Sequence, residues 1–294
     1  ARIQVLTTVV SLSLAVALAI LGAGIWALVA QQVSLAAVRL AGILYLSRFR
    51  PALSFKLRLV TPHLIFARDA LSVSAISVIK AQVAVVAIGK FNGEASLGLF
   101  AMSARFSKLP QFGLVGPVST VVYVRMAKAQ GDPERLVRIY LAAINLMATL
   151  LLPLLAMTAV AGGAIFTVML SEEWMEIAPI FALSISGLAL EAIAVTLLAC
   201  IFRATGRTDL DVRLSMESTI IYTGLVLTAA FLSDVSVVAA AISLWGFLIV
   251  PRGWYLAKKV VPIEIPDCLN VLLVPVALSL AMAGAHAVLR SSFQ

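Results

Sequence analysis

Long apolar stretches separated by short polar segments follow one another along the whole chain. About nine such stretches of roughly 20 residues can be traced, each long enough to cross about 30 Å of hydrocarbon as a helix. They cover approximately residues 3–21, 24–46, 65–89, 97–124, 141–162, 178–202, 214–232, 235–256 and 268–289. Backbone polar groups in lipid must pair within their own segment, and the alternating short strands of a transmembrane barrel are not seen. The pattern predicts an all-α membrane protein, a polytopic bundle of about nine transmembrane helices.

Composition supports this class and bears on possible cofactors. Of the 294 residues, 62% are hydrophobic and 12% are charged, and the mean hydropathy is +1.07, whereas soluble domains are about half apolar and about a quarter charged. Cys200 and Cys268 lie in apolar stretches without the spacing of metal ligands, so we interpret them as small core residues. His63 and His286 have no acidic or cysteine cluster around them. No metal and no other cofactor is predicted.

Basic residues are concentrated in alternate connections between the apolar stretches. The segments 47–64, 125–140, 203–213 and 252–259 hold most of the 22 lysines and arginines, whereas the connections between them hold few. By the positive-inside rule the basic connections are cytoplasmic, with the N-terminus inside and the C-terminus outside. The net charge of +8 then reflects loops that face anionic lipid, and binding to nucleic acid is not predicted.

Polar side chains also fall inside the predicted spans, where they are costly and usually face a bundle interior or a water-filled cavity. Gln32 and Arg39 are seven residues apart on the second span and share a helix face, as do Asp69 and Lys80 on the third. On the fourth span, an arginine and a lysine three residues apart precede Pro110 and Pro117, which are expected to break or bend that helix. The expected cavity residues are Arg39, Lys80, Arg105, Lys108, Gln32, Arg68 and Asp69.

The excess of positive charge predicts a hydrated cationic cavity lined by the second, third and fourth spans and suited to an anionic group such as phosphate. The alternative is that these groups pair with one another or extend to the interface, and it is equally supported for Arg68 and Asp69 near the membrane edge. Glu191 in the sixth span is a candidate for ion coupling, with a hydrogen-bonded structural role as its alternative. No catalytic residue is predicted.

Several short motifs resemble polysaccharide-export flippases of the multidrug/oligosaccharidyl-lipid/polysaccharide superfamily, and their order along the chain fits as well. They are Gly24–Gln32 followed by Arg48-Phe-Arg50-Pro51, Leu97–Phe100 followed by Ala104-Arg105-Phe106 and Leu109-Pro110, Ala127–Leu136 with Tyr140, Glu173-Trp174 followed by Ala178-Pro179-Ile180, and Ala204–Arg207.

The resemblance implies two six-helix lobes with extra C-terminal helices, and a chain that is a fragment lacking the N-terminal helices. On this plan residues 1–46 are the last two helices of the first lobe, and 47–64 are a basic cytoplasmic linker between lobes. Residues 65–256 are the complete second six-helix lobe, and 257–294 contain an extra C-terminal helix. We expect the cavity to be divided between the two lobes.

The resemblance also implies a function. Such proteins flip polyprenyl-pyrophosphate-linked oligosaccharide across the bacterial inner (cytoplasmic) membrane by alternating access, for exopolysaccharide or lipopolysaccharide biosynthesis. The expected partners are this lipid-linked oligosaccharide, membrane lipids and other polysaccharide assembly proteins. A drug or metabolite antiporter of the same superfamily is an alternative that an acidic cavity would favour. A membrane glycosyltransferase or polymerase would need a substantial outer loop with catalytic groups, and the candidates here are Glu172, Glu173 and Glu176 on a short one. The chain is therefore predicted not to be an enzyme.

Overall fold

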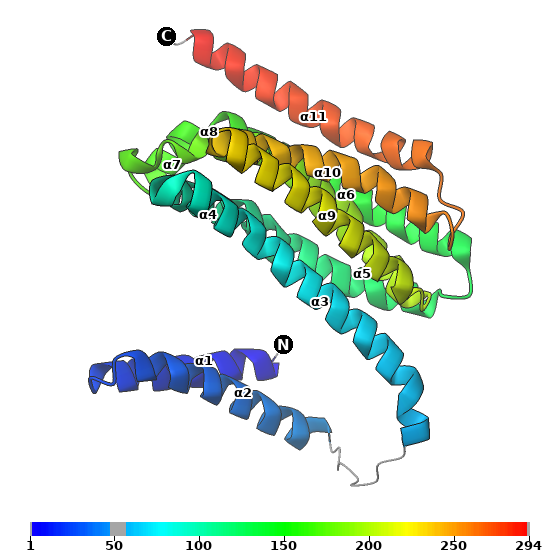
Figure 1. The fold of residues 1–294 in the computed structure, drawn as a ribbon. Helices are drawn as coiled ribbons and strands as arrows, with labels where there is room; N and C mark the ends of the chain where they lie inside the picture. Colours follow the sequence, from blue (N-terminus) through cyan, green and yellow to red (C-terminus); the bar gives the residue numbers. More distant parts are fainter. Residues whose placement is uncertain (1, 48–56, 293–294) are drawn as a thin grey trace. The chain divides into compact units, whose positions relative to one another are not determined.

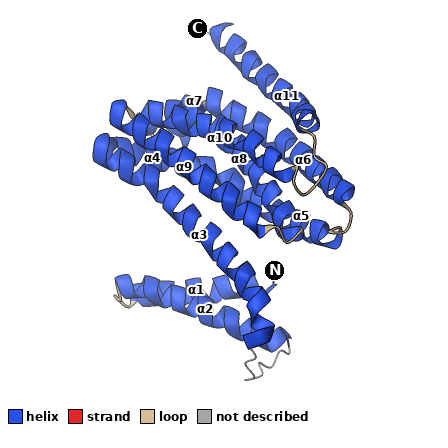
Figure 2. Ribbon diagram, turned by 45° about the vertical axis from the view of Figure 1, so that its right-hand side comes forward, coloured by secondary structure: helices blue, strands red, loops and turns tan. Residues whose placement is uncertain are grey.

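The computed structural model describes residues 2–47 and 57–292, and within these ranges the regular elements are helices, with no strand (Figure 2). This confirms the predicted all-α class. The chain divides into two compact units, Ala1–Val60 and Thr61–Gln294, which are described separately below.

The first unit is a pair of helices, α1 (Arg2–Ile20) and α2 (Ile25–Ser47), packed against each other. A turn of four residues joins them, and within it Gly22 has φ +81° and Gly24 has φ +53°. These left-handed conformations are strained for residues with a Cβ, which explains the two glycines in so short a connection.

The second unit contains the remaining helices, joined by short connections, with the first turn of α3 lying before the unit boundary (Figure 1). Its long helices alternate in direction, as expected for neighbouring elements joined by short loops. In chain order its elements are α3 (Leu57–Phe91), α4 (Gly93–Pro110), the π-helix η1 (Gln111–Val115), α5 (Gly116–Lys128), α6 (Pro133–Val160), α7 (Gly162–Met169), the 3₁₀-helix η2 (Glu172–Trp174), α8 (Ile177–Ala204), α9 (Thr208–Leu232), α10 (Val235–Ala257) and α11 (Ile265–Ser292).

Helix α8 is the centre of this unit, and α4, α5, α6 and α10 all pack against it. Its contact with α10 is made through backbone atoms, because Gly187 and Gly246 have no side chain to separate the two helices. A Cβ added at Gly187 would overlap the backbone of Ser243. The Ser243 hydroxyl lies 2.6 Å from the Ser186 hydroxyl and accepts the N–H of Gly187 at 2.9 Å. Helix α11 lies outermost, against α6 (Figure 1).

Seven helices in the described residues are long and apolar enough to cross a membrane: Trp26–Tyr45, Ala67–Phe91, Pro133–Val160, Ile177–Ala204, Thr208–Leu232, Val235–Ala257 and Ile265–His286. Two of the predicted spans, the first and the fourth, are not among these seven helices. The apolar part of α1, Leu6–Ile20, falls in a shorter class. The predicted fourth span is interrupted between Pro110 and Pro117 and consists of α4, η1 and α5, each of which packs on α8.

The helices extend further into the basic connections than the hydropathy pattern indicates. In the predicted linker 47–64, helix α3 begins at Leu57, while residues 48–56, with Arg48, Arg50 and Lys56, lie outside the described residues. In the basic segment 125–140 only residues 129–132 are outside helices. There the Asp132 carboxylate accepts the N–H of Arg135 at 2.9 Å and caps α6, as expected for an N-cap aspartate.

The connections that fall within or beside the predicted basic segments lie together in the second unit. The segments 129–132, 205–207 and 258–264 are at one end, on the right in Figure 1, and the α3–α4 turn and α7 are at the other. The short helix α7 at this other end is tied into the core. Phe166 is completely buried, with its ring 5.0 Å from that of Phe106 and 5.5 Å from that of Phe181.

Candidate functional site

One face of α4 is left open by the packing of this unit, and it carries two of the predicted basic residues. This face is a stripe of exposed residues that recur every three or four positions along the helix. They are Gly98, Ala101, Arg105 and Lys108. The opposite face, which includes Phe100 and Ser103, is buried. Because a helix packs through its buried face, the stripe points away from α8. Small residues precede the two cations, which leaves space above this part of the helix.

Neither cation of this stripe is neutralised by its surroundings. Among the described residues, no Asp or Glu oxygen lies within 4.0 Å of Arg105 or Lys108. Arginines at the basic end of the unit are different, because several of them have carboxylate partners. The pairs there are Arg203–Asp211 at 3.0 Å, Arg207–Asp209 at 2.9 Å, Arg213–Glu217 at 2.9 Å and Arg252–Glu217 at 2.7 Å. Hydrogen bonds from Arg207, in the α8–α9 connection, to Asp209 raise the pKa of its guanidinium further, so that it stays charged.

Lys80 is the predicted cavity residue that the structure places most specifically. Its ammonium lies 3.9 Å from the Glu191 carboxylate on α8 and 4.4 Å from the centroid of the Trp245 ring on α10. The side chains of Lys80 and Glu191 are 25% and 18% exposed. A cation over an indole face is attracted by the ring as well as by the carboxylate. At the position of Lys80, helix α3 is therefore connected to α8 and α10 through one long side chain.

The surroundings of this pair hold residues that sequence reasoning did not identify. Trp245 is buried, its indole N–H donates to the Ser218 carbonyl at 3.1 Å, and its ring meets that of Tyr222 edge-on at 5.2 Å. These contacts fix the ring beneath the Lys80 ammonium. The available signal was an indole in the middle of an apolar span, away from the membrane interfaces where Trp is usually enriched.

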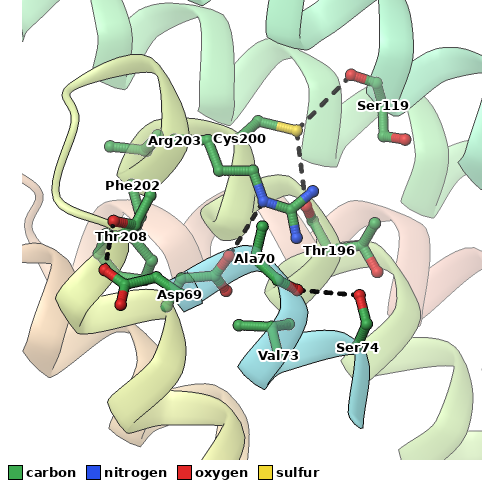
Figure 3. Close-up of polar contacts among 12 residues, drawn as sticks. Asp69, Ala70, Val73, Ser74, Ser119, Thr196, Cys200, Phe202, Arg203 and Thr208 are labelled. Carbon is green, nitrogen blue, oxygen red and sulfur yellow. Dashed lines mark hydrogen bonds and ion pairs between the residues drawn. The ribbon is translucent and has the colours of Figure 1, made fainter. Parts of the chain in front are cut away.

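Arg68 and Asp69 form an ion pair near the basic end of α3. Mutual pairing was one of the two alternatives that the sequence supported equally for these residues. The Arg68 guanidinium donates to the Asp69 carboxylate at 2.8 Å, with the Arg68 side chain 72% exposed. The second carboxylate oxygen of Asp69, which is a buried residue, accepts the hydroxyl of Thr208 at 2.9 Å. Figure 3 shows Asp69 and Thr208 facing each other beside Arg203. Asp69 thus attaches α3 to the first residue of α9.

Gln32 and Arg39 belong to the first unit. Both are exposed on α2, seven residues apart and on one face. The site described above is confined to the second unit, and the participation of Gln32 and Arg39 stays a prediction. In the part of the chain that the structure describes, no group of three His, Cys, Asp or Glu residues could hold a metal ion.

The sequence is related to proteins of bacterial polysaccharide assembly. Residues 1–179 match the family described as polysaccharide biosynthesis protein. The chain is 28% identical over 171 residues to the succinoglycan biosynthesis transport protein ExoT of Rhizobium meliloti (strain 1021), covering 58% of this chain and 34% of that protein. It is 27% identical over 293 residues to the teichuronic acid biosynthesis protein TuaB of Bacillus subtilis (strain 168), covering 96% of this chain and 58% of that protein. The chain thus spans between a third and three fifths of these relatives' lengths.

The fold has a solved counterpart as well. The structure resembles the lipid II flippase MurJ in its inward closed conformation, with a TM-score of 0.60 at 15% sequence identity, covering 99% of this chain and 68% of that chain. At this identity the likeness concerns the fold. Together with the apolar helices it identifies a multi-pass membrane protein with this fold.

Proposed function

The chain belongs to the polysaccharide biosynthesis protein family, and from this premise we propose that it flips a polyprenyl-pyrophosphate-linked oligosaccharide across the bacterial cytoplasmic membrane by alternating access. Family membership confirms the resemblance that its sequence motifs indicate. The named relatives are described as proteins of succinoglycan biosynthesis transport and teichuronic acid biosynthesis. The fold shared with a lipid II flippase supports a lipid-linked substrate.

The observation that carries the proposal is the unpaired cationic stripe on α4. An unpaired charge within the hydrocarbon costs several kcal/mol, on the order of 3 by insertion measurements. Arg105 and Lys108 lie on an exposed helix face without a carboxylate partner among the described residues. A hydrated cavity removes this cost, and an anion that enters the cavity binds to them. A diphosphate fits both, because the guanidinium donates to two oxygens in parallel and the ammonium acts as a compact charge.

The other functional classes are less well supported by the same residues. A drug or metabolite antiporter of this superfamily would be favoured by an acidic cavity, but Glu191 already faces Lys80. A glycosyltransferase or polymerase would need catalytic groups on a substantial outer loop. Glu172 and Glu173 lie on the single turn of η2, and Glu176 lies just before α8. We therefore propose that the chain is not an enzyme.

Coupling to an ion is assigned to Glu191 as part of this proposal. When a diphosphate enters the cavity it competes with Glu191 for the Lys80 ammonium. A partly buried carboxylate that loses its counterion is costly, and uptake of a proton neutralises it. Binding of the anion and protonation of Glu191 are then linked through a single lysine. Gln32 and Arg39, on α2, remain predicted substrate-binding residues.

The remaining parts of the proposal concern placement and partners. The basic end of the second unit faces the cytoplasm, because cytoplasmic loops are enriched in Lys and Arg. Residues 1–46 are the end of the first lobe, 47–64 the linker, 65–256 the second lobe and 257–294 an extra helix. The protein is embedded among membrane lipids and works beside other polysaccharide assembly proteins.

The test uses the intact protein with both cations of the stripe removed. In a strain that lacks the gene, the Arg105→Ala/Lys108→Ala variant should accumulate in the membrane normally but fail to restore surface polysaccharide. The lipid-linked glycan should then accumulate on the inner leaflet. A matched control is Arg125→Ala/Lys128→Ala, another exposed arginine and lysine three residues apart, near the basic end of α5. Normal surface polysaccharide in the first variant would overturn the cavity assignment.

A further inference from the structure

Two arginines share one glutamate on the neighbouring helices α9 and α10. The Arg252 guanidinium donates to both carboxylate oxygens of Glu217, through Nε at 2.7 Å and through Nη2 at 2.8 Å. Arg213, one turn before Glu217 on α9, donates to the same carboxylate through Nε at 2.9 Å. These three side chains form an ion network with one positive charge in excess. The pair of Arg203 with Asp211, at the same end of the unit, is balanced by contrast.

The network also keeps hydrogen-bond donors that the protein does not use. A guanidinium has five N–H groups in a planar fork. Among the residues that the structure describes, both Nη groups of Arg213 and the Nη1 group of Arg252 have no acceptor. The two side chains are 53% and 32% exposed. An anion that approaches the network therefore meets both the excess charge and free donors.

The network lies inside two candidate membrane spans, near their basic ends. Arg213 follows Thr208, the first residue of α9, by five positions, and Arg252 precedes Ala257, the last residue of α10, by five. Five residues span about 7–8 Å along a helix, and the interfacial region on each side of a bilayer is about 5–8 Å thick. A helix that ends at the membrane surface thus places such residues where headgroups meet hydrocarbon.

Exposed apolar side chains adjoin the network on both helices. Ile220 follows Glu217 by three residues, and Leu248 precedes Arg252 by four; both are exposed. The exposed ring of Tyr255 has its centroid 5.4 Å from the guanidinium carbon of Arg252, and tyrosine is typical of membrane interfaces. The surface therefore combines a small charged patch with an apolar surround, as a phospholipid combines a phosphate with acyl chains.

The size of the excess charge favours one kind of phosphate. A phosphodiester carries one negative charge, which neutralises an excess of one positive charge, whereas the α4 stripe with its two unpaired cations suits a diphosphate better. Guanidinium groups donate to phosphate oxygens in parallel. Basic pockets between transmembrane helices on the cytoplasmic side bind anionic lipid headgroups. Because uncompensated charge at membrane depth is costly, a bound phosphodiester would stabilise the network.

We propose that Arg213 and Arg252 bind the phosphodiester of an anionic phospholipid in the leaflet at the basic end, with its acyl chains against the apolar side chains of α9 and α10. Glu217 fixes the two guanidiniums and limits their excess charge to one unit. This site is separate from the α4 stripe, and the inference does not depend on the proposed function.

The test measures lipid binding to the intact protein in a neutral detergent by native mass spectrometry. The probes are dioleoylphosphatidylglycerol, which is anionic, and dioleoylphosphatidylcholine, which has the same acyl chains and no net charge. The unmodified protein should bind its first phosphatidylglycerol about tenfold more tightly than phosphatidylcholine, the effect of about one charge-assisted hydrogen bond. Equal affinities for the two lipids would overturn the site.

Arg213→Gln removes the excess charge and leaves the two hydrogen bonds between Arg252 and Glu217 intact, so it should fold. It should lower the affinity for phosphatidylglycerol about fivefold, as expected for one unit charge at about 4 Å in water, and leave that for phosphatidylcholine unchanged. Arg138→Gln is the matched control, because Arg138 lies five residues into α6 and 3.9 Å from Glu134, one turn away. A full preference in Arg213→Gln, or an equal loss in Arg138→Gln, would overturn the proposal.

Glu217→Gln distinguishes lipid binding from a purely structural network. Without the carboxylate the excess rises from one positive charge to two, so the affinity for phosphatidylglycerol should increase about fivefold. A network that serves only to join α9 to α10 would loosen in this variant and gain no affinity. Unchanged or weaker binding of phosphatidylglycerol would therefore contradict the proposed site.

A last arm distinguishes a phospholipid from the substrate lipid. Polyprenyl pyrophosphate is added to the Arg105→Ala/Lys108→Ala protein, which lacks the cations of the stripe. It should bind more weakly than phosphatidylglycerol, because its diphosphate carries more charge than the network neutralises. Tighter binding that Arg213→Gln abolishes would assign the site to the diphosphate and overturn the phospholipid. Failure of the proposed function would show instead as normal surface polysaccharide in cells with Arg105→Ala/Lys108→Ala, and it would leave this site unaffected.

Discussion

Helix α8 contacts its neighbours α10 and α3 in opposite ways. Against α10 the backbones touch at Gly187, Ser243 and Gly246, so the two helices have almost no freedom to separate or slide. Against α3 the contact is made by the Lys80 side chain, which spans the space to Glu191 and Trp245. In the most apolar 18-residue stretch of each helix, 56% of the α8 residues are buried but only 17% of the α3 residues.

The difference teaches which contacts can change during a transport cycle. A backbone contact between glycines is either made or lost, because nothing flexible bridges the helices. A lysine has a flexible stem of four methylene groups, so its ammonium can change partners while the helix stays in place. The cations of the proposed cavity in this unit lie on α3 and α4, outside the rigid α8–α10 contact. We infer that α8 and α10 act as a fixed support for a polar face whose contacts are exchanged.

The largest effect is expected from a methyl group placed in the rigid contact. Gly187→Ala puts a Cβ into the backbone of Ser243 and must push α10 away. We expect a loss of about 3 kcal/mol or more in the free energy of unfolding, at or beyond the upper end for overpacked cores. Titration with SDS in mixed micelles measures it.

The matched change for this prediction is Gly224→Ala in α9, where an added Cβ would meet no atom within 4 Å. It should alter stability by less than about 1 kcal/mol, in the direction of a small gain from helix propensity. Equal effects of the two substitutions would contradict the view that the α8–α10 contact is set by backbone atoms.

A smaller effect is expected at the exchangeable contact. Lys80→Met keeps an unbranched side chain, one atom shorter, but leaves Glu191 without its cation. It should lower the free energy of unfolding by about 1–2 kcal/mol, less than for a fully buried pair. Adding Glu191→Gln should recover most of this loss, because no unpaired carboxylate remains. A double-mutant cycle from SDS titrations gives the coupling free energy.

The same helix offers a control for this cycle. Lys90→Met removes an exposed lysine at the far end of α3, whose ammonium lies 5.5 Å from the Phe91 ring, and should change stability little. Absence of coupling between positions 80 and 191 would show that their proximity has no energetic consequence. It would also remove the basis for ion coupling through Glu191.

Hydropathy and helical periodicity predicted much of this structure, and they failed where contacts depend on distant residues. Apolar length located the spans, and Pro110 and Pro117 correctly indicated an interrupted fourth crossing. Periodicity placed Asp69 and Lys80 on one face of α3, but it could not identify their partners, because Glu191 and Thr208 are more than a hundred residues away. The ring beneath Lys80 was missed for the same reason.

The contact between Gly187 and Gly246 shows a second limit of local patterns. Glycines in apolar helices are common, and no neighbour in sequence distinguishes one that touches another backbone from one that meets open space, such as Gly224. The π-helix is similar. The prolines predicted a break or bend, but no local pattern indicated that a π-helix would form between them.

The smallest effect is expected at the basic end of α3, where the Asp69–Thr208 hydrogen bond is another contact of the exchangeable kind (Figure 3). Thr208→Val preserves shape and removes the hydroxyl, but Asp69 keeps its hydrogen bonds from Arg68. Since one partner of the carboxylate survives, we expect the melting temperature of the intact protein to fall by only about 2 °C. Thr120→Val is the control, because that exposed hydroxyl donates to the Gly116 carbonyl of its own helix. If Thr208→Val lowered the melting temperature as much as Gly187→Ala, α3 would be as firmly held as α10, and the distinction between a rigid support and an exchangeable face would be wrong.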